Sequence, residues 1–117
     1  SIVKPIINNN IAFLITENDL LVSINIKTNK ILFSRKITNQ VAKFVNTKKK
    51  NKLNFINILL LNNKIYIFLQ NSYLLKFNLN GELNDIYKLP SKIDTSPIVI
   101  NQKILFINKK NNLVIMD

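Results

Sequence analysis

The sequence predicts an all-β fold built from repeated antiparallel hairpins, for three reasons. Nearly half of the 117 residues are apolar, rich in Ile, Leu and Phe but poor in Ala, which favours strands over helices. Asn-rich turn sequences recur between short apolar segments, as expected for a chain of hairpins. No window of eleven or more residues keeps the 3.6-residue period of a helix, so almost no helix is expected.

Three segments of the chain line up as copies of one unit. Each unit reads as a turn, a short apolar strand, a turn, a second strand, a turn and a third strand. Ile11, Ile65 and Ile104 hold equivalent places and are separated by 54 and 39 residues. The shorter spacing is close to the period of about 40 residues that is typical of β-propeller blades. An insertion at residues 46–54 explains the longer spacing.

Strands are expected wherever a short apolar segment lies between two turns. The expected ranges are 11–16, 20–26, 31–37, 41–45, 55–61, 65–70, 73–79, 83–89, 97–100, 104–108 and 113–116. Several of these ranges alternate apolar and polar residues. Ser23 and Asn25 interrupt the apolar residues of 20–26, and Lys76 and Asn78 interrupt those of 73–79. This alternation predicts strands that are buried on one face only.

The turns are expected to use Asn in place of Gly, because the chain has a single glycine, Gly81. Tight hairpin turns need residues at positive φ, and the short polar side chain of Asn tolerates that conformation. The expected turns lie at residues 9–10, 28–30, 62–63, 80–82, 101–102 and 111–112.

These units together predict antiparallel β-propeller blades, about two and a half of them, in an incomplete propeller. Residues 1–117 then form one partial propeller domain, with blade-like units near 1–42, 43–91 and 92–117 and the Lys/Asn-rich insertion at 46–54. Propellers close with about four to eight blades. We therefore expect the chain to be the C-terminal part of a longer protein or a fragment of one, and a small open sheet that pairs with a second copy is the alternative.

The order of turns and strands resembles the repeat of quinoprotein-type (PQQ-type) propellers. Pro5 and Pro97 match the proline that opens this repeat. Asn25 with residues 28–30, and Asn78 with residues 80–82, match its Asn/Asp-x-x-Thr-Gly-Lys turn.

The repeat usually places a Trp after that turn, where the Trp docks on the neighbouring blade. The resemblance implies that Phe33 and Tyr87 stand in for it here. Among such propellers, the chain is similar to the outer-membrane protein assembly lipoprotein B (BamB) family.

This resemblance implies a non-catalytic scaffold for protein–protein interaction in outer-membrane β-barrel assembly. It implies a protein partner, the β-barrel assembly machinery, with no small-molecule substrate. It also implies a place at the periplasmic face of the outer membrane, with peripheral membrane association through an N-terminal lipid anchor upstream of Ser1.

The composition excludes several kinds of chemistry. Cys, His and Trp are all missing, which removes thiolate and imidazole ligands, the usual catalytic bases, and the aromatic floor of a quinone cofactor. We therefore expect no enzyme activity and assign no catalytic, cofactor-binding or metal-binding residue. Glu17 and Asp19 could share one face of a turn as a weak cation site, but a solvated hairpin tip explains them more simply.

The net charge of +11 leaves two interpretations of the Lys-rich insertion open. Lys48, Lys49, Lys50 and Lys52 are the candidate contacts for a partner or an anion. Nucleic acid or an anionic surface could bind there, which makes a basic β-domain the alternative function. The abundance of Asn, Lys and Ile, 57 of the 117 residues, also fits an A/T-rich genome and a merely solvated loop. A fragment of a PQQ-dependent dehydrogenase, with its catalytic residues elsewhere, is a further alternative.

Overall fold

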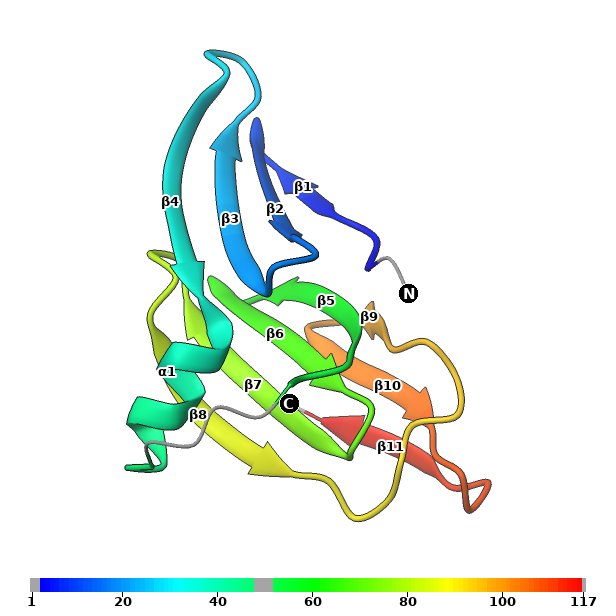
Figure 1. The fold of residues 1–117 in the computed structure, drawn as a ribbon. Coiled ribbons are helices and arrows are strands. Elements are labelled where there is room, and N and C mark those ends of the chain that lie inside the picture. Colours follow the sequence, from blue (N-terminus) through cyan, green and yellow to red (C-terminus); the bar gives the residue numbers. More distant parts are fainter. Residues whose placement is uncertain (1–2, 48–51, 117) are drawn as a thin grey trace.

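The computed structural model describes residues 3–47 and 52–116, and it contains three antiparallel sheets (Figure 1). The first sheet has the order β1 (Ile6–Asn8), β2 (Ile11–Ile15), β3 (Leu20–Asn25) and β4 (Lys30–Lys36). The second has the order β5 (Phe55–Leu61), β6 (Lys64–Leu69), β7 (Tyr73–Asn78) and β8 (Leu83–Lys88). The third has the order β9 (Ile98–Ile100), β10 (Lys103–Ile107) and β11 (Leu113–Met116).

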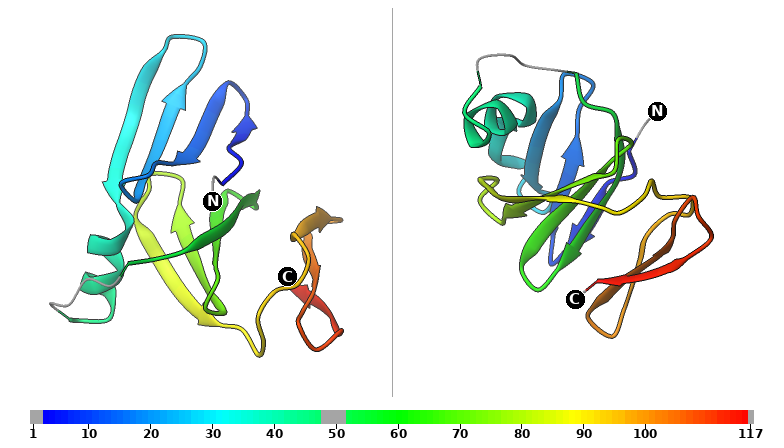
Figure 2. Two further views of the ribbon diagram at one scale, coloured as in Figure 1. Left: turned by 45° about the vertical axis from the view of Figure 1, so that its right-hand side comes forward. Right: turned by 90° about the horizontal axis from the view of Figure 1, so that it is seen from below.

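The three sheets stand one after another like adjacent blades, with the second sheet in the middle (Figure 2). The buried apolar residues form two clusters, one on each face of that middle sheet. The first cluster joins the first and second sheets through Val3, Phe13, Leu21, Ile37, Ile58, Ile65, Ile67, Leu69, Leu75 and Phe77. The other joins the second and third sheets through Leu61, Tyr66, Phe68, Leu74, Leu89, Ile93, Ile104 and Phe106. The architecture is that of an incomplete β-propeller, as the repeats predicted.

The middle sheet is buried on both faces, so the expectation of half-buried strands is wrong there. Neighbouring residues of a strand point to opposite faces. Leu74 and Leu75 are consecutive on β7 and only 0% and 1% exposed, and they belong to different clusters. The first sheet departs from the expectation too: Ser23, placed on the polar face, is buried, and so is Val22 on the other face.

The strand expected at residues 41–45 is also wrong, because that segment lies largely in a helix, α1 (Ile37–Phe44). The helix follows β4 directly and buries Ile37, Thr38 and Ala42. The helix ends at Phe44, and two residues later Asn46 has a left-handed φ of 55°, while the N–H of Thr47 donates to the carbonyl of Ala42 at 2.9 Å. No helix in the described part of the chain is long and apolar enough to cross a membrane.

The turn prediction is confirmed by the backbone. The first hairpin turn of each sheet has positive φ at both central residues: Asn9 and Asn10, Asn62 and Asn63, Asn101 and Gln102. Each of these turns joins two strands through two residues, which is the geometry that requires positive φ twice. Asn29, Gly81 and Asn111 also have positive φ, in the other expected turns.

The turn at residues 62–63 gives a direct stability test. Replacing Asn63 by Ala is expected to cost about 1–2 kcal/mol, because an ordinary Cβ crowds the following carbonyl in the left-handed region. Replacing it by Gly is expected to be neutral or stabilising, since Gly adopts this φ freely. Urea denaturation of both variants checks the order, which an equal loss in the two would contradict.

Candidate functional site

The strand β4 and the helix α1 hold the edge of the second sheet through the turn between β7 and β8. The guanidinium Nε of Arg35 donates to the carbonyl of Asn80 at 2.9 Å. The Gln40 side chain makes two bonds at 2.8 Å: its Nε2 donates to the carbonyl of Gly81, and its Oε1 accepts from the N–H of Leu83. These bonds fix α1 against the sheet.

Phe33 packs on the same turn and confirms the expectation that it docks on the neighbouring sheet. A Cβ built on Gly81 would lie 2.7 Å from Cδ1 of Phe33 and 2.9 Å from its Cζ, so the ring lies directly on the glycine backbone. The φ of Gly81 is +86°, a second reason for glycine at this position. Phe33 also packs against the first apolar cluster.

Tyr87 does not hold the equivalent place, and this part of the expectation is wrong. A bulge interrupts each outer pairing, after Ser23 in the first sheet and after Lys76 in the second. Phe33 pairs with Ser23, whereas the partner of Lys76 is Asp85. Tyr87 lies two residues beyond that position.

Gln40 is expected to contribute measurably to stability. Gln40→Ala leaves the N–H of Leu83 and the carbonyl of Gly81 without this partner, which should cost about 1–3 kcal/mol. Asn39→Ala, on the exposed side of the same helix, is the matched control and should change stability by less than about 0.5 kcal/mol. Thermal unfolding of both variants measures the difference, and equal values would show that the Gln40 bonds contribute nothing.

The packing of α1 leaves a cavity of about 330 Å³ between the helix and the second sheet, here called the α1 cavity. Its walls are apolar and come from the helix and its C-terminal end, the end of the insertion, and β6 to β8: Val41, Ala42, Val45, Leu53, Leu69, Leu75 and Ile86. Polar groups of Thr38, Thr47, Lys52 and Asn71 also line it. This size is at the lower limit of sites that hold small ligands or a side chain of a partner.

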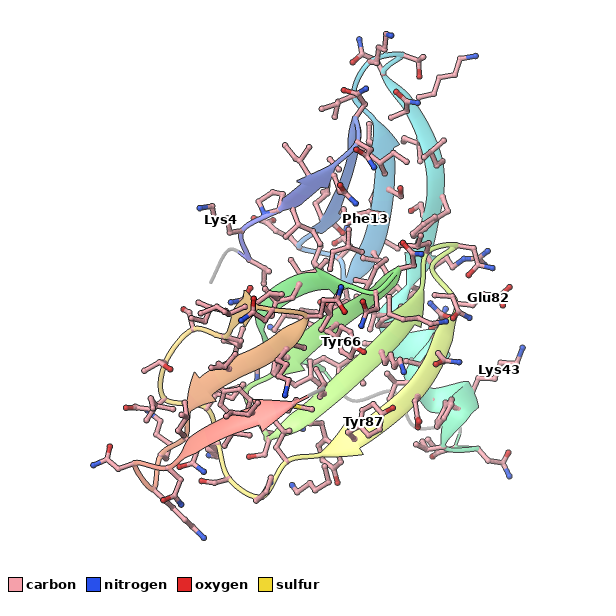
Figure 3. The ribbon with its side chains drawn as sticks, turned by 180° about the vertical axis from the view of Figure 1, so that it is seen from behind. Lys4, Phe13, Lys43, Tyr66, Glu82 and Tyr87 are labelled. Carbon is pink, nitrogen blue, oxygen red and sulfur yellow. The ribbon has the colours of Figure 1, made fainter. Side chains whose placement is uncertain are left out.

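The rim of the α1 cavity combines aromatic and basic groups. Tyr73 lines the cavity and is 37% exposed, and the Nζ of Lys88 lies 4.3 Å from the centre of its ring. Such a contact is a cation–π interaction. Val45, at the end of α1, is 53% exposed. Lys43 projects from the same helix away from the sheets (Figure 3).

The structure places only one of the predicted contact residues. Lys52 is exposed and lines the α1 cavity. Lys48, Lys49 and Lys50 lie outside the described residues, so their role stays a prediction. Lys52 also lines a neighbouring groove together with Glu17 and Asp19, the two carboxylates considered as a weak cation site. The described residues contain no group of three or more His, Cys, Asp or Glu that could hold a metal ion.

The helical side of this site was not predicted from the sequence. Residues 41–45 were expected to form a strand, so it was not expected that Val41, Ala42 and Val45 would line one cavity. The available signal was the spacing of Ile37 and Val41, which brings two apolar residues to one side of a helix. Eight residues are too few for that signal to stand out against a short apolar strand.

The comparisons with known proteins extend the fold assignment. No protein-family model and no curated protein sequence matches the chain. Among solved structures, BamB from Moraxella catarrhalis is similar, with a TM-score of 0.70 over 96% of this chain and 12% sequence identity. The chain spans 30% of the length of that protein. The fold is therefore that of a BamB-like β-propeller segment.

Proposed function

We propose that this chain is a non-catalytic β-propeller scaffold that binds a protein partner in outer-membrane β-barrel assembly, at the periplasmic face of the outer membrane. The observation that carries this proposal is the likeness to BamB over nearly the whole chain. The repeat pattern supports the same assignment independently of the coordinates, because its turns and spacings resemble the quinoprotein-type repeat.

The α1 cavity is the surface that we assign to the partner. Its apolar walls can bury one or two apolar side chains, and burial of apolar area supplies most of the affinity of such contacts. Lys52 and Lys88 lie at this surface, so acidic groups next to the buried side chain would be attracted. The partner segment is therefore apolar with acidic flanks.

Binding to the purified β-barrel assembly machinery tests this function. The chain is immobilised, and the affinity is measured by biolayer interferometry for the wild type and for Val45→Asp, which places a charge at the apolar rim. Val45→Asp should weaken binding by at least about tenfold, the equivalent of about 1.4 kcal/mol. Absence of wild-type binding would contradict the proposed function.

A pair of charge reversals assigns the surface. Lys52→Glu lies at the α1 cavity, whereas Lys27→Glu makes the same charge change in the exposed turn between β3 and β4. We expect a loss for the first and little change for the second. Binding should also survive moderate salt, because an apolar contact is not screened. A steep loss of affinity with salt would favour the basic, anion-binding alternative.

A further inference from the structure

The turn between β7 and β8 contains the one Asn–Gly pair of the sequence, Asn80–Gly81. An Asn followed by Gly is prone to spontaneous loss of its side-chain amide, because glycine has no side chain that hinders attack by its own backbone nitrogen. Asn80 is exposed, so ammonia can leave and water can enter. A chemically reactive pair therefore lies in the turn on which the first sheet docks.

The reaction is intramolecular and consumes only water. The Gly81 nitrogen gives up its proton and bonds to Cγ of Asn80, while the Cγ–Nδ2 bond breaks and ammonia leaves with that proton. Water then opens the five-membered ring. Opening at Cγ gives aspartate, and opening at the backbone carbonyl carbon gives isoaspartate, whose main chain runs through the former side chain. Ring closure requires a free backbone N–H and a side chain that can reach it in the correct orientation.

The folded turn supplies neither requirement. The N–H of Gly81 donates to the carbonyl of Asn78 at 2.9 Å, so the proton that must leave is held. The Oδ1 of Asn80 accepts from the N–H of Glu82 at 3.0 Å, which fixes the side chain. Gly81 is buried with the ring of Phe33 on its backbone, so a base has no direct access to its nitrogen.

Three contacts from β4 and α1 hold the turn in this unreactive state. Arg35 bonds to the carbonyl of Asn80, Gln40 bonds to the carbonyl of Gly81, and Phe33 covers the glycine. All three are lost together when the first sheet and α1 move away from the second sheet. The hydrogen bonds inside the turn are then exposed to water and can open, while β7 and β8 stay paired.

We propose that Asn80 is a modification site controlled by docking: it deamidates when the first sheet undocks from the second, and the isoaspartate product prevents redocking. Isoaspartate adds one atom to the main chain between positions 80 and 81. Gly81 is thereby displaced from beneath Phe33 and from its bond with Gln40. The aspartate product keeps the original backbone and can dock again. This inference does not depend on the proposed function.

Peptide mapping by mass spectrometry, after incubation at fixed pH and temperature, measures the rate at Asn80. Conversion should be slow in the folded wild type and fast in concentrated urea. Gln40→Ala removes docking bonds and should speed conversion in the folded chain by about tenfold or more, since a loss of about 1.4 kcal/mol multiplies an open population tenfold. Arg35→Met removes a different bond to the turn and should act in the same direction. Circular dichroism verifies that both variants are folded.

Leu74→Ala is the matched control, because Leu74 is buried on the opposite face of the middle sheet. It lowers overall stability without touching the docking contacts, so the rate at Asn80 should stay at the wild-type value. Equal rates in buffer and in urea would overturn the proposal. So would equal acceleration by Leu74→Ala and Gln40→Ala, since conversion would then follow global unfolding. The purified isoaspartate form should lack the NOE between Phe33 and Gly81, and its retention would contradict the block on redocking.

Discussion

Leu74→Ala and Leu75→Ala are each expected to lower the free energy of unfolding by about 2–5 kcal/mol. The two residues are consecutive on β7 and point to opposite faces of the middle sheet. Leu74 is buried against the third sheet and Leu75 against the first. A strand at the surface of a two-layer protein would lose stability at only one of two such positions. Urea denaturation, with a check that the slope is unchanged, measures both values.

Ile26→Ala provides the control for this pair, because Ile26 is 42% exposed and belongs to neither cluster. Its loss should be below about 1 kcal/mol. If only Leu75→Ala lowers the free energy of unfolding, the third sheet does not cover the second in solution. If only Leu74→Ala lowers it, the first sheet does not cover the second.

Gly81→Ala is expected to cost about 2–5 kcal/mol, from two separate causes. The φ of +86° is unfavourable for any residue with a Cβ, which accounts for about 1–2 kcal/mol. The new methyl group would also overlap the ring of Phe33, which must shift from the first cluster; overpacking of this kind adds about 1–3 kcal/mol. Thermal or urea unfolding measures the total.

A double-mutant cycle separates the two causes. Phe33→Ala removes the ring, so Gly81→Ala in that background should cost only the backbone part. The two losses should therefore be strongly non-additive, as expected for residues in contact. Simple additivity, within about 0.5 kcal/mol, would show that Phe33 does not rest on Gly81.

The parts of the fold that depend on local chemistry were predictable from the sequence. Gly and Asn tolerate the left-handed conformation best. The pairs Asn9–Asn10 and Asn62–Asn63 therefore predicted two turns, and the apolar segments on either side of each turn predicted the strands of the hairpin. The repeat spacing then predicted the blades. The docking role of Phe33 came from the resemblance to the quinoprotein-type repeat, which places an aromatic residue after this turn.

The parts decided by packing between sheets were not predictable in this way. The alternation around Lys76 suggested one buried face, but Leu74 lies on the other face and is buried in the cluster that joins the second and third sheets. In both sheets the docking position lies four residues after a turn residue with positive φ, Phe33 after Asn29 and Asp85 after Gly81, so the aromatic side chain of Tyr87 indicated the wrong position.

The largest feature that the sequence did not predict is the helix α1, and the α1 cavity was therefore not predicted either. An eight-residue helix is marginal on its own, so its stability comes from contacts with other elements. Here Gln40 bonds to the turn between β7 and β8, forty-one residues away along the chain. A sequence read locally cannot show that contact. Of the predicted contact residues, Lys52 belongs to the site because that packing places it there.

The most direct test of the stacked-sheet architecture is a NOESY spectrum of the isotopically labelled chain in solution. Two contacts each join different sheets: the ring of Phe33 with Gly81, and the ring of Phe68 with that of Phe106, whose centres lie 5.9 Å apart. Cross-peaks for both pairs are expected. A spectrum with cross-strand peaks inside each sheet but neither of these two contacts would show hairpins that do not stack as blades.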